Sequence, residues 1–223
     1  MKSVSEEIRY TEARRRMVDR LRNEGILKTE RLIDLMKIMP RHFFVDQPLW
    51  EIAYEDQPLP IGEGQTISHP STVARMLELL DVQKHHRVLE IGSGSGYVTA
   101  ILAVLSAKLY SVEWYESLAR RARSRLDQLG LYTVRVEVGD GSQGWPSAAP
   151  FDRIIVSAGS PETAIVLQNQ LSPGGRLVIP IGSRSRQRVW LIRRIDGEFV
   201  RQEYTDCVFV DLLGRHGWTV QNP

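Results

Sequence analysis

The sequence predicts an α/β fold built on a doubly wound, mostly parallel sheet of about seven strands, with an N-terminal helical appendage. The first observation behind this prediction is an apolar run from Val88 to Ile91, followed by glycines at positions 92, 94 and 96 and by helix formers from Thr99 to Leu105. Strand, glycine turn and helix in this order are typical of the first half of a nucleotide-binding βαβ unit. The second observation is that strand-like and helix-like stretches keep alternating afterwards, which favours a parallel sheet covered on both faces.

The composition is that of an ordinary globular chain. It has 223 residues, of which 42% are apolar and 25% charged, enough for one domain or one domain with an appendage. The 29 Lys and Arg residues nearly balance the 27 Asp and Glu residues, so nothing indicates a nucleic-acid partner. No apolar run approaches the ~20 residues of a membrane span, the N-terminus lacks an apolar secretory core, and a single cysteine fits a reducing compartment. We therefore expect a cytoplasmic monomer with neither nucleic acid nor membrane as a partner.

Two helices are predicted at the N-terminus. The first begins at a capping box formed by Ser3 and Glu6 and ends near Gly25. The second is capped by Thr29 and stopped by Pro40.

The stretch from residue 40 to residue 70 is expected to hold little regular structure, because prolines and glycines interrupt it repeatedly. Irregular stretches of this length inside a compact domain are usually functional. A helix is predicted to follow over residues 71–80. We therefore divide the chain into residues 1–80, which hold the N-terminal helices and a substrate-side loop packed on the core, and residues 81–223, which form that core; the two make one compact unit.

The other elements of the core follow in chain order. Strands are expected over residues 109–112, 134–138, 151–157 and 176–181, helices over 118–129 and 162–171, and two late strands over 189–194 and 208–213. Because no helical pattern separates the late strands, we expect the far edge of the sheet to be antiparallel.

Acidic residues stand at the ends of the first three strands of the core: Glu90, Glu113 and Asp140. In open α/β sheets the ligand binds outside these carboxyl ends, where Glu113 can accept hydrogen bonds from ribose hydroxyls and Asp140 from an adenine amino group. A carboxylate as close to the glycine turn as Glu90 would repel the pyrophosphate of NAD, which is the weaker alternative. S-adenosylmethionine (SAM) carries an ammonium, a sulfonium and no phosphate, so it is the expected cofactor. The expected cofactor-binding residues are Glu90, Gly92, Ser93, Gly94, Gly96, Glu113, Asp140 and Gly141.

Several motifs agree with this expectation. They are Pro40 to Val45, Ala53 to Gly62 (AYEDQPLPIG), Gly64 to Ser68 (GQTIS), Val88 to Gly96, Gly139 to Gly141, and Leu171 to Leu177 (LSPGGRL). With them the chain resembles the protein-L-isoaspartate (D-aspartate) O-methyltransferase family, from about Thr29 to Ile181. The resemblance implies a Rossmann-like class I SAM-dependent methyltransferase fold. It also implies methyl transfer to the α-carboxylate of L-isoaspartyl residues in damaged proteins or peptides, a repair reaction.

The expected chemistry needs no general base, because the nucleophile is the substrate carboxylate, which is already ionised at neutral pH. The hydroxyls of Thr66 and Ser68 can orient that carboxylate, so these two are the expected catalytic residues, and the resemblance also implies Ser68 at the active site. The alternative for Ser68 is a cap on the helix that follows. The expected substrate-binding residues are Ile61, Gln65, Ile67, His69 and Val210.

Two positions depart from the pattern of the family and leave the acceptor open. They are His69 and Asp211, and Asp211 would place an acid close to an anionic substrate. The alternatives are therefore a carboxyl methyltransferase for another acceptor, such as an aspartate of a peptide natural product, and a SAM-binding module without turnover. No His, Cys or acid spacing suggests a metal, and none is expected.

Overall fold

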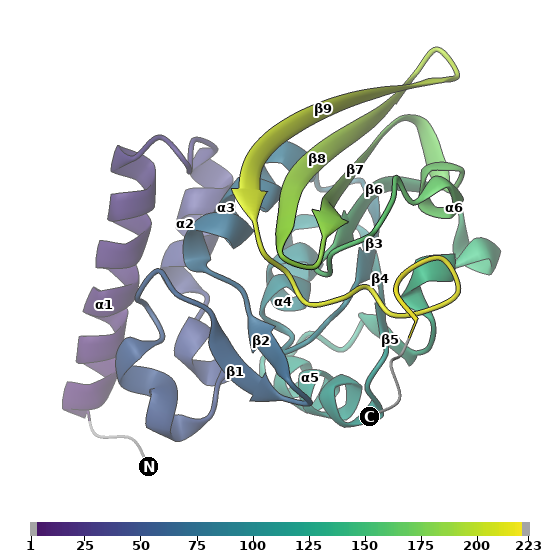
Figure 1. The fold of residues 1–223 in the computed structure, drawn as a ribbon. Coiled ribbons are helices and arrows are strands. Elements are labelled where there is room, and N and C mark those ends of the chain that lie inside the picture. The colour runs from purple at the N-terminus through teal and green to yellow at the C-terminus, as the bar shows by residue number, and fades with distance from the viewer. Residues whose placement is uncertain (1–3, 220–223) are drawn as a thin grey trace.

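In a computed structural model, which describes residues 4–219, a seven-stranded sheet lies between two layers of helices and loops (Figure 1). Its strands are β3 (Arg87–Ile91), β4 (Lys108–Glu113), β5 (Arg135–Val138), β6 (Phe151–Val156), β7 (Leu171–Ser183), β8 (Arg186–Ile195) and β9 (Glu198–Cys207). The strand order is β5-β4-β3-β6-β7-β8-β9, with parallel pairing from β5 to β7 and antiparallel pairing at β7–β8 and β8–β9. The doubly wound sheet and its antiparallel far edge are therefore confirmed. The chain order reverses between β3 and β6, and a ligand crevice is expected at the carboxyl ends beside such a reversal.

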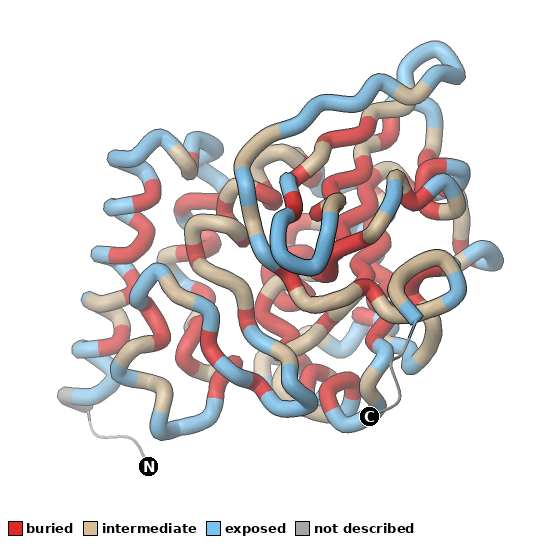
Figure 2. The backbone as a smooth tube through the Cα atoms, in the orientation of Figure 1, coloured by how far each residue is buried: buried red, intermediate tan, exposed pale blue. Residues whose placement is uncertain are grey.

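Helices cover the sheet unequally. The helices are α1 (Val4–Asn23), α2 (Glu30–Ile38), α3 (Pro70–Leu80), α4 (Tyr97–Leu105), α5 (Glu116–Gln128) and α6 (Ile165–Gln168). Residues of α1 to α5 share one apolar cluster with one face of the sheet, whereas α6 joins the cluster on the other face. Buried positions are concentrated in the strands and on the inner sides of the helices, while the turn of the β8–β9 hairpin is exposed (Figure 2).

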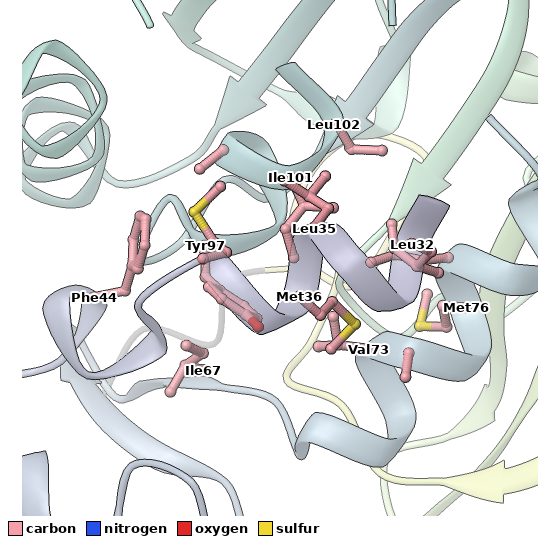
Figure 3. Packing of buried hydrophobic residues seen from close by; sticks show 14 of the residues in the cluster. Leu32, Leu35, Met36, Phe44, Ile67, Val73, Met76, Tyr97, Ile101 and Leu102 are labelled. Carbon is pink, nitrogen blue, oxygen red and sulfur yellow. The ribbon is translucent and has the colours of Figure 1, made fainter. Parts of the chain in front are cut away.

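The N-terminal helices are part of the larger cluster. In its interior Met36 of α2 lies beside Val73 of α3, and Leu35 of α2 lies beside Ile101 of α4 (Figure 3). Apolar side chains recurring on one side of each helix explain this packing. Ser3, half of the expected capping box, lies outside the described residues. The division of the chain at residue 80 stays a prediction.

The segment between α2 and α3 is more ordered than expected. It contains two 3-10 helices, η1 (Arg41–Phe44) and η2 (Gln47–Ile52), and a hairpin of β1 (Leu59–Gly62) and β2 (Gln65–Ile67). The hairpin turns at Glu63 and Gly64, both with positive φ, and glycine adopts such angles without steric cost. Strands this short, with two prolines near them, carry too little periodic pattern to be seen in the sequence.

Two expected elements of the core are wrong. The helix expected over residues 162–171 is one turn, because Ala164 adopts positive φ before it and β7 already begins at Leu171. The last strand is Glu198–Cys207 and not residues 208–213. This strand, β9, forms the edge of the sheet and is largely polar, whereas the apolar run after it leaves the sheet and runs beside Gly159.

Candidate active site

A cavity opens at the carboxyl ends of β3 and β4. We call it the cofactor pocket. Its walls come from the β1–β2 hairpin, the glycine turn, the end of β4, the loop after β6 and the chain after β9. Of the expected site residues, it is lined by Ile61, Gln65, Thr66, Ile67, Ser68, Gly92, Ser93, Gly94, Glu113, Gly141 and Val210. Glu90, Gly96, Asp140 and His69 do not line it.

The glycine turn brings bare backbone to the pocket. Gly92, Gly94 and Gly96 have φ values of +86°, +50° and +89°, which L-residues rarely adopt. A Cβ on Gly94 would lie 3.3 Å from the side chain of Ile61 across the pocket. A Cβ on Gly96 would lie 3.3 Å from Ala122 of α5, so this third glycine permits the close packing of α4 on α5 and does not contact the ligand space.

Glu113, at the end of β4, links the glycine turn to the chain that follows β4. Its Oε2 accepts a hydrogen bond from the backbone N–H of Gly94 (2.8 Å), and its Oε1 accepts one from Tyr115 (3.0 Å). The residue is 5% exposed and lines the pocket. Each carboxylate oxygen has a second lone pair, so Glu113 can still accept hydrogen bonds from a ligand.

Glu90 lies in β3 just before the glycine turn and is not among the residues that line the pocket. It is fully buried, and Ser111 donates a hydrogen bond to its Oε2 (2.7 Å), while its Oε1 has no hydrogen-bond partner within residues 4–219. Burial raises the pKa of Glu90 to about 7, with a smaller contribution from the charge of Glu113.

Asp140 does not line the pocket but joins the segment after β5 to the C-terminal segment by hydrogen bonds. Its Oδ1 accepts hydrogen bonds from the backbone N–H and hydroxyl of Ser142, and its Oδ2 accepts from the side chain of Gln143 and the backbone of Arg215. Burial alone would raise the pKa of Asp140, but these hydrogen bonds outweigh it and lower the pKa below its usual value. The adjacent Gly141 lines the pocket, so the expected adenine contact of Asp140 stays a prediction.

A second cavity adjoins the cofactor pocket. We call it the substrate cleft; it is lined by Pro58, Thr66, Ser68, His69, Thr72, Ser157, Asp206, Cys207, Val208, Phe209 and Val210. Thr66, Ser68, Ser157 and Val210 line both cavities. The two expected catalytic residues therefore stand on the wall between them, and His69 lies on the cleft side alone.

Ser68 does not cap the following helix. His69 occupies the N-cap position of α3 without a side-chain hydrogen bond, and Asp56 accepts a hydrogen bond from the N–H of Ser71 (2.9 Å). The capping alternative for Ser68 is therefore wrong, because Asp56 supplies the acceptor.

Arg41 fixes the backbone at Ser68 from inside the protein. It is fully buried; its Nη2 donates to the carbonyl of Ser68 (2.7 Å) and its Nε to the carbonyl of Ala53 (2.8 Å). Burial lowers the pKa of Arg41 to about 10, so it stays charged at neutral pH. Its motif is visible in the sequence, but nothing local predicts this distant contact.

Other lining residues were missed in the sequence. They are mainly residues that follow strand ends or the last strand: Trp114, Tyr115, Ser157, Ala158, Leu212 and Leu213. Asp211, which the sequence places near the substrate, lines the pocket as well. The position of Trp114 and Tyr115 directly after Glu113 is a signal that could have found them. Within residues 4–219, no group of three or more His, Cys, Asp or Glu side chains could hold a metal, and no helix is long and apolar enough to cross a membrane.

Comparisons with known proteins agree with this geometry. The family model described as protein-L-isoaspartate(D-aspartate) O-methyltransferase matches residues 12–217. The protein-L-isoaspartate O-methyltransferase of Geobacter metallireducens is 49% identical over 208 residues, which cover 92% of this chain and 96% of that protein. The enzyme of the same name from Syntrophus aciditrophicus is 46% identical over 215 residues, which cover 95% and 98%.

Solved structures show the same relationship. A candidate protein-L-isoaspartate O-methyltransferase from Plasmodium falciparum, crystallised with S-adenosyl-L-homocysteine, superimposes with a TM-score of 0.78 at 25% identity, covering 90% of this chain and 98% of that one. The similarity spans the helical N-terminal part as well as the sheet. The chain belongs to the protein-L-isoaspartate (D-aspartate) O-methyltransferase family.

Proposed function

We propose how this chain carries out the reaction of its family, the transfer of a methyl group from SAM to the α-carboxylate of L-isoaspartyl residues in damaged proteins or peptides. The observation that carries the proposal is the shared wall: Thr66 and Ser68 border both the cofactor pocket and the substrate cleft. A group on that wall can touch an acceptor in the cleft at the point where it meets the donor.

The cofactor pocket fits SAM. The bare backbone of the glycine turn admits the methionine part, and Glu113 provides a carboxylate for the ribose hydroxyls. Gly141 and Trp114 border the end where an adenine would lie. Glu90, in β3, and Gly96, in the glycine turn, do not line this pocket, and their roles in the proposal are structural.

When bound, SAM supplies an electrophilic methyl group on a positively charged sulfur. The acceptor carboxylate is ionised at neutral pH, so the chain only has to orient it and exclude water. The Ser68 and Thr66 hydroxyls donate hydrogen bonds to one carboxylate oxygen and leave the other free to react. Ile61, Ile67 and Val210 make the wall apolar, and a less polar site favours a reaction in which a negative and a positive charge disappear together.

The acceptors are proteins or peptides that contain isoaspartyl residues. Exposed residues, among them Pro58, Asp206 and Val208, line the substrate cleft, so a chain segment can enter it from outside. The proposed polar contacts of the acceptor are His69, which lines the cleft, and Gln65, which lines the neighbouring cofactor pocket. The proposal includes a monomer that acts in the cytoplasm, with neither nucleic acid nor a membrane as a partner; the near balance of charge supports the absence of nucleic acid.

The decisive experiment compares acceptors. The protein is incubated with labelled SAM and with an isoaspartyl peptide or its aspartyl counterpart, and base-labile methyl ester is counted. We expect label on the isoaspartyl peptide alone, since its extra backbone methylene moves the carboxylate. Equal labelling of both peptides would favour a different acceptor, and SAM binding without any ester would indicate a module without turnover.

A further inference from the structure

An acid lies in the cofactor pocket, next to the wall that this pocket shares with the substrate cleft. Asp211 lines the cofactor pocket beside Val210, which also borders the substrate cleft, and its side chain is 27% exposed. No Lys or Arg is among the described residues that line this pocket. An unpaired carboxylate here would repel the acceptor carboxylate, because like charges in a site of reduced dielectric disfavour each other by several kcal/mol.

Asp211 is held in that wall by its backbone. Gly159, in the loop after β6, donates to the carbonyl of Val210 (2.7 Å), and its own carbonyl accepts from Leu212 (2.9 Å). Asp211 therefore sits between two main-chain hydrogen bonds and forms a parallel bridge with Gly159. These two hydrogen bonds fix the main chain at Asp211 next to Gly159.

The charge of Asp211 is matched by a residue from another element. Arg184, in the turn between β7 and β8, donates from its Nε to Oδ2 of Asp211 (2.8 Å). The guanidinium also lies 4.5 Å from the ring of Trp218, whose Nε1 donates to the carbonyl of Gly159 (3.0 Å). The aromatic face and the carboxylate fix the orientation of the guanidinium, and its side chain is 41% exposed.

The substrate cleft repeats this arrangement. Its one lining acid, Asp206, lies 3.4 Å from Nε of Arg188, a residue of β8 that also pairs with Glu203. Asp211 of the cofactor pocket and Asp206 of the substrate cleft are thus paired with arginines from β8 or the turn before it. The arginines neutralise these two carboxylates, so that they repel an incoming carboxylate less.

We propose that Arg184 is a specificity-determining residue for the acceptor: it cancels the charge of Asp211, so that the pocket wall accepts an anionic group. The inference rests on the proposed function, because it needs a carboxylate as the acceptor. Arg184 acts through Asp211 and is not a catalytic residue.

A charge cycle tests the inference. KM for the isoaspartyl peptide, KM for SAM and kcat are measured for wild type, Arg184→Gln, Asp211→Asn and the double variant. We expect Arg184→Gln to raise the peptide KM about three- to tenfold, Asp211→Asn to lower it, and the double variant to return it to the wild-type value. Added salt should reduce the defect of Arg184→Gln, because it screens the exposed charge of Asp211. KM for SAM should stay constant throughout.

Two further variants control the cycle. Arg186→Gln removes a positive charge from the first residue of β8, outside the ion pair, and should leave the peptide KM at the wild-type value. Arg184→Lys keeps the charge, so its peptide KM should stay near the wild-type value even if Arg184→Gln folds poorly. The inference would be overturned if Arg184→Gln and the double variant raised the peptide KM equally and if salt did not change that rise. Arg184 would then act only by holding the turn between β7 and β8 in place. A rise in the SAM KM in Asp211→Asn would overturn it too, by assigning Asp211 to the cofactor. If wild type methylates no isoaspartyl peptide, the proposed function itself fails and the inference with it.

Discussion

At the scale of one residue, the backbone and the side chain of Ser68 have different roles. Its carbonyl is held by the buried Arg41, and its side chain borders both cavities. We expect Ser68→Ala to lower kcat and kcat/KM together, by about ten- to a hundredfold, since one hydrogen bond to a charged group contributes roughly 1.5–3 kcal/mol. Steady-state kinetics and a thermal melt on the same sample check this. Asp56→Ala is the matched control, because it removes the cap of α3 and should cost about 1 kcal/mol of stability. Wild-type turnover in Ser68→Ala would remove Ser68 from the mechanism.

Glu90 gives a prediction about pH. Its pKa is raised to about 7 in the folded state, so between its unfolded value of 4.5 and pH 7 the folded protein keeps a proton that the unfolded chain has released. The free energy of unfolding therefore falls as the pH rises through this window, by an amount on the order of 3 kcal/mol. Glu90→Gln cannot ionise, so its melting temperature relative to wild type should rise between pH 5 and pH 8 in the cofactor-free protein. A difference independent of pH would show that Glu90 titrates normally.

Single residues also show what sequence can predict about a site. The glycines, Glu113, Thr66 and Ser68 were predictable because each belongs to a local pattern beside a strand end or a loop. Arg41, Asp211 and Arg184 were not predictable as a group, since their contacts join segments 12 to 27 residues apart. The cofactor contact of Glu90 stays a prediction: a strand end says which edge of the sheet a residue lies near, but Glu90 is fully buried beside Ser111 and is not among the lining residues.

At the scale of elements, the packing of α4 on α5 depends on Gly96. Gly96→Ala meets two obstacles, a φ of +89° and a Cβ 3.3 Å from Ala122. Gly130→Ala has a similar φ of +75° but nothing within 4 Å, so it isolates the cost of the angle. We expect Gly130→Ala to cost about 1 kcal/mol and Gly96→Ala about 1–3 kcal/mol more, with weaker SAM binding in Gly96→Ala alone. Denaturant unfolding and calorimetric titration measure both. Equal costs would show that α4 shifts freely.

The elements that sequence predicted well are those with two buried faces or a clear apolar stripe. β3, β4 and β6 are buried along nearly their whole length and each carries a short apolar run, and α3 has one apolar side. β9 fails this criterion because it pairs with β8 on one side only and exposes most of its residues. The apolar residues 208–213 resembled a strand because they are partly buried, but what they border is the ligand space and the loop after β6.

At the scale of the whole molecule, α2 and the central sheet share one cluster, so they should unfold together. Met36 is fully buried in that cluster, and Met36→Ala should lower the free energy of unfolding by about 2–5 kcal/mol. Ile38→Ala on the same helix removes a 69% exposed side chain and should change it by less than about 0.5 kcal/mol. Tryptophan fluorescence and far-ultraviolet circular dichroism should follow one transition in each variant. Two separated transitions in Met36→Ala would show that the N-terminal helices unfold as an independent unit.

The wall shared by the two cavities also has a kinetic consequence. Because the cofactor pocket and the substrate cleft are lined by largely different residues and meet only at a few of them, each ligand has its own route to the point of reaction. Neither product has to wait for the other to depart, and no enzyme-bound methyl intermediate is required. Initial rates measured against both substrates should therefore give intersecting double-reciprocal lines, the pattern of a ternary complex, and either product can be released first.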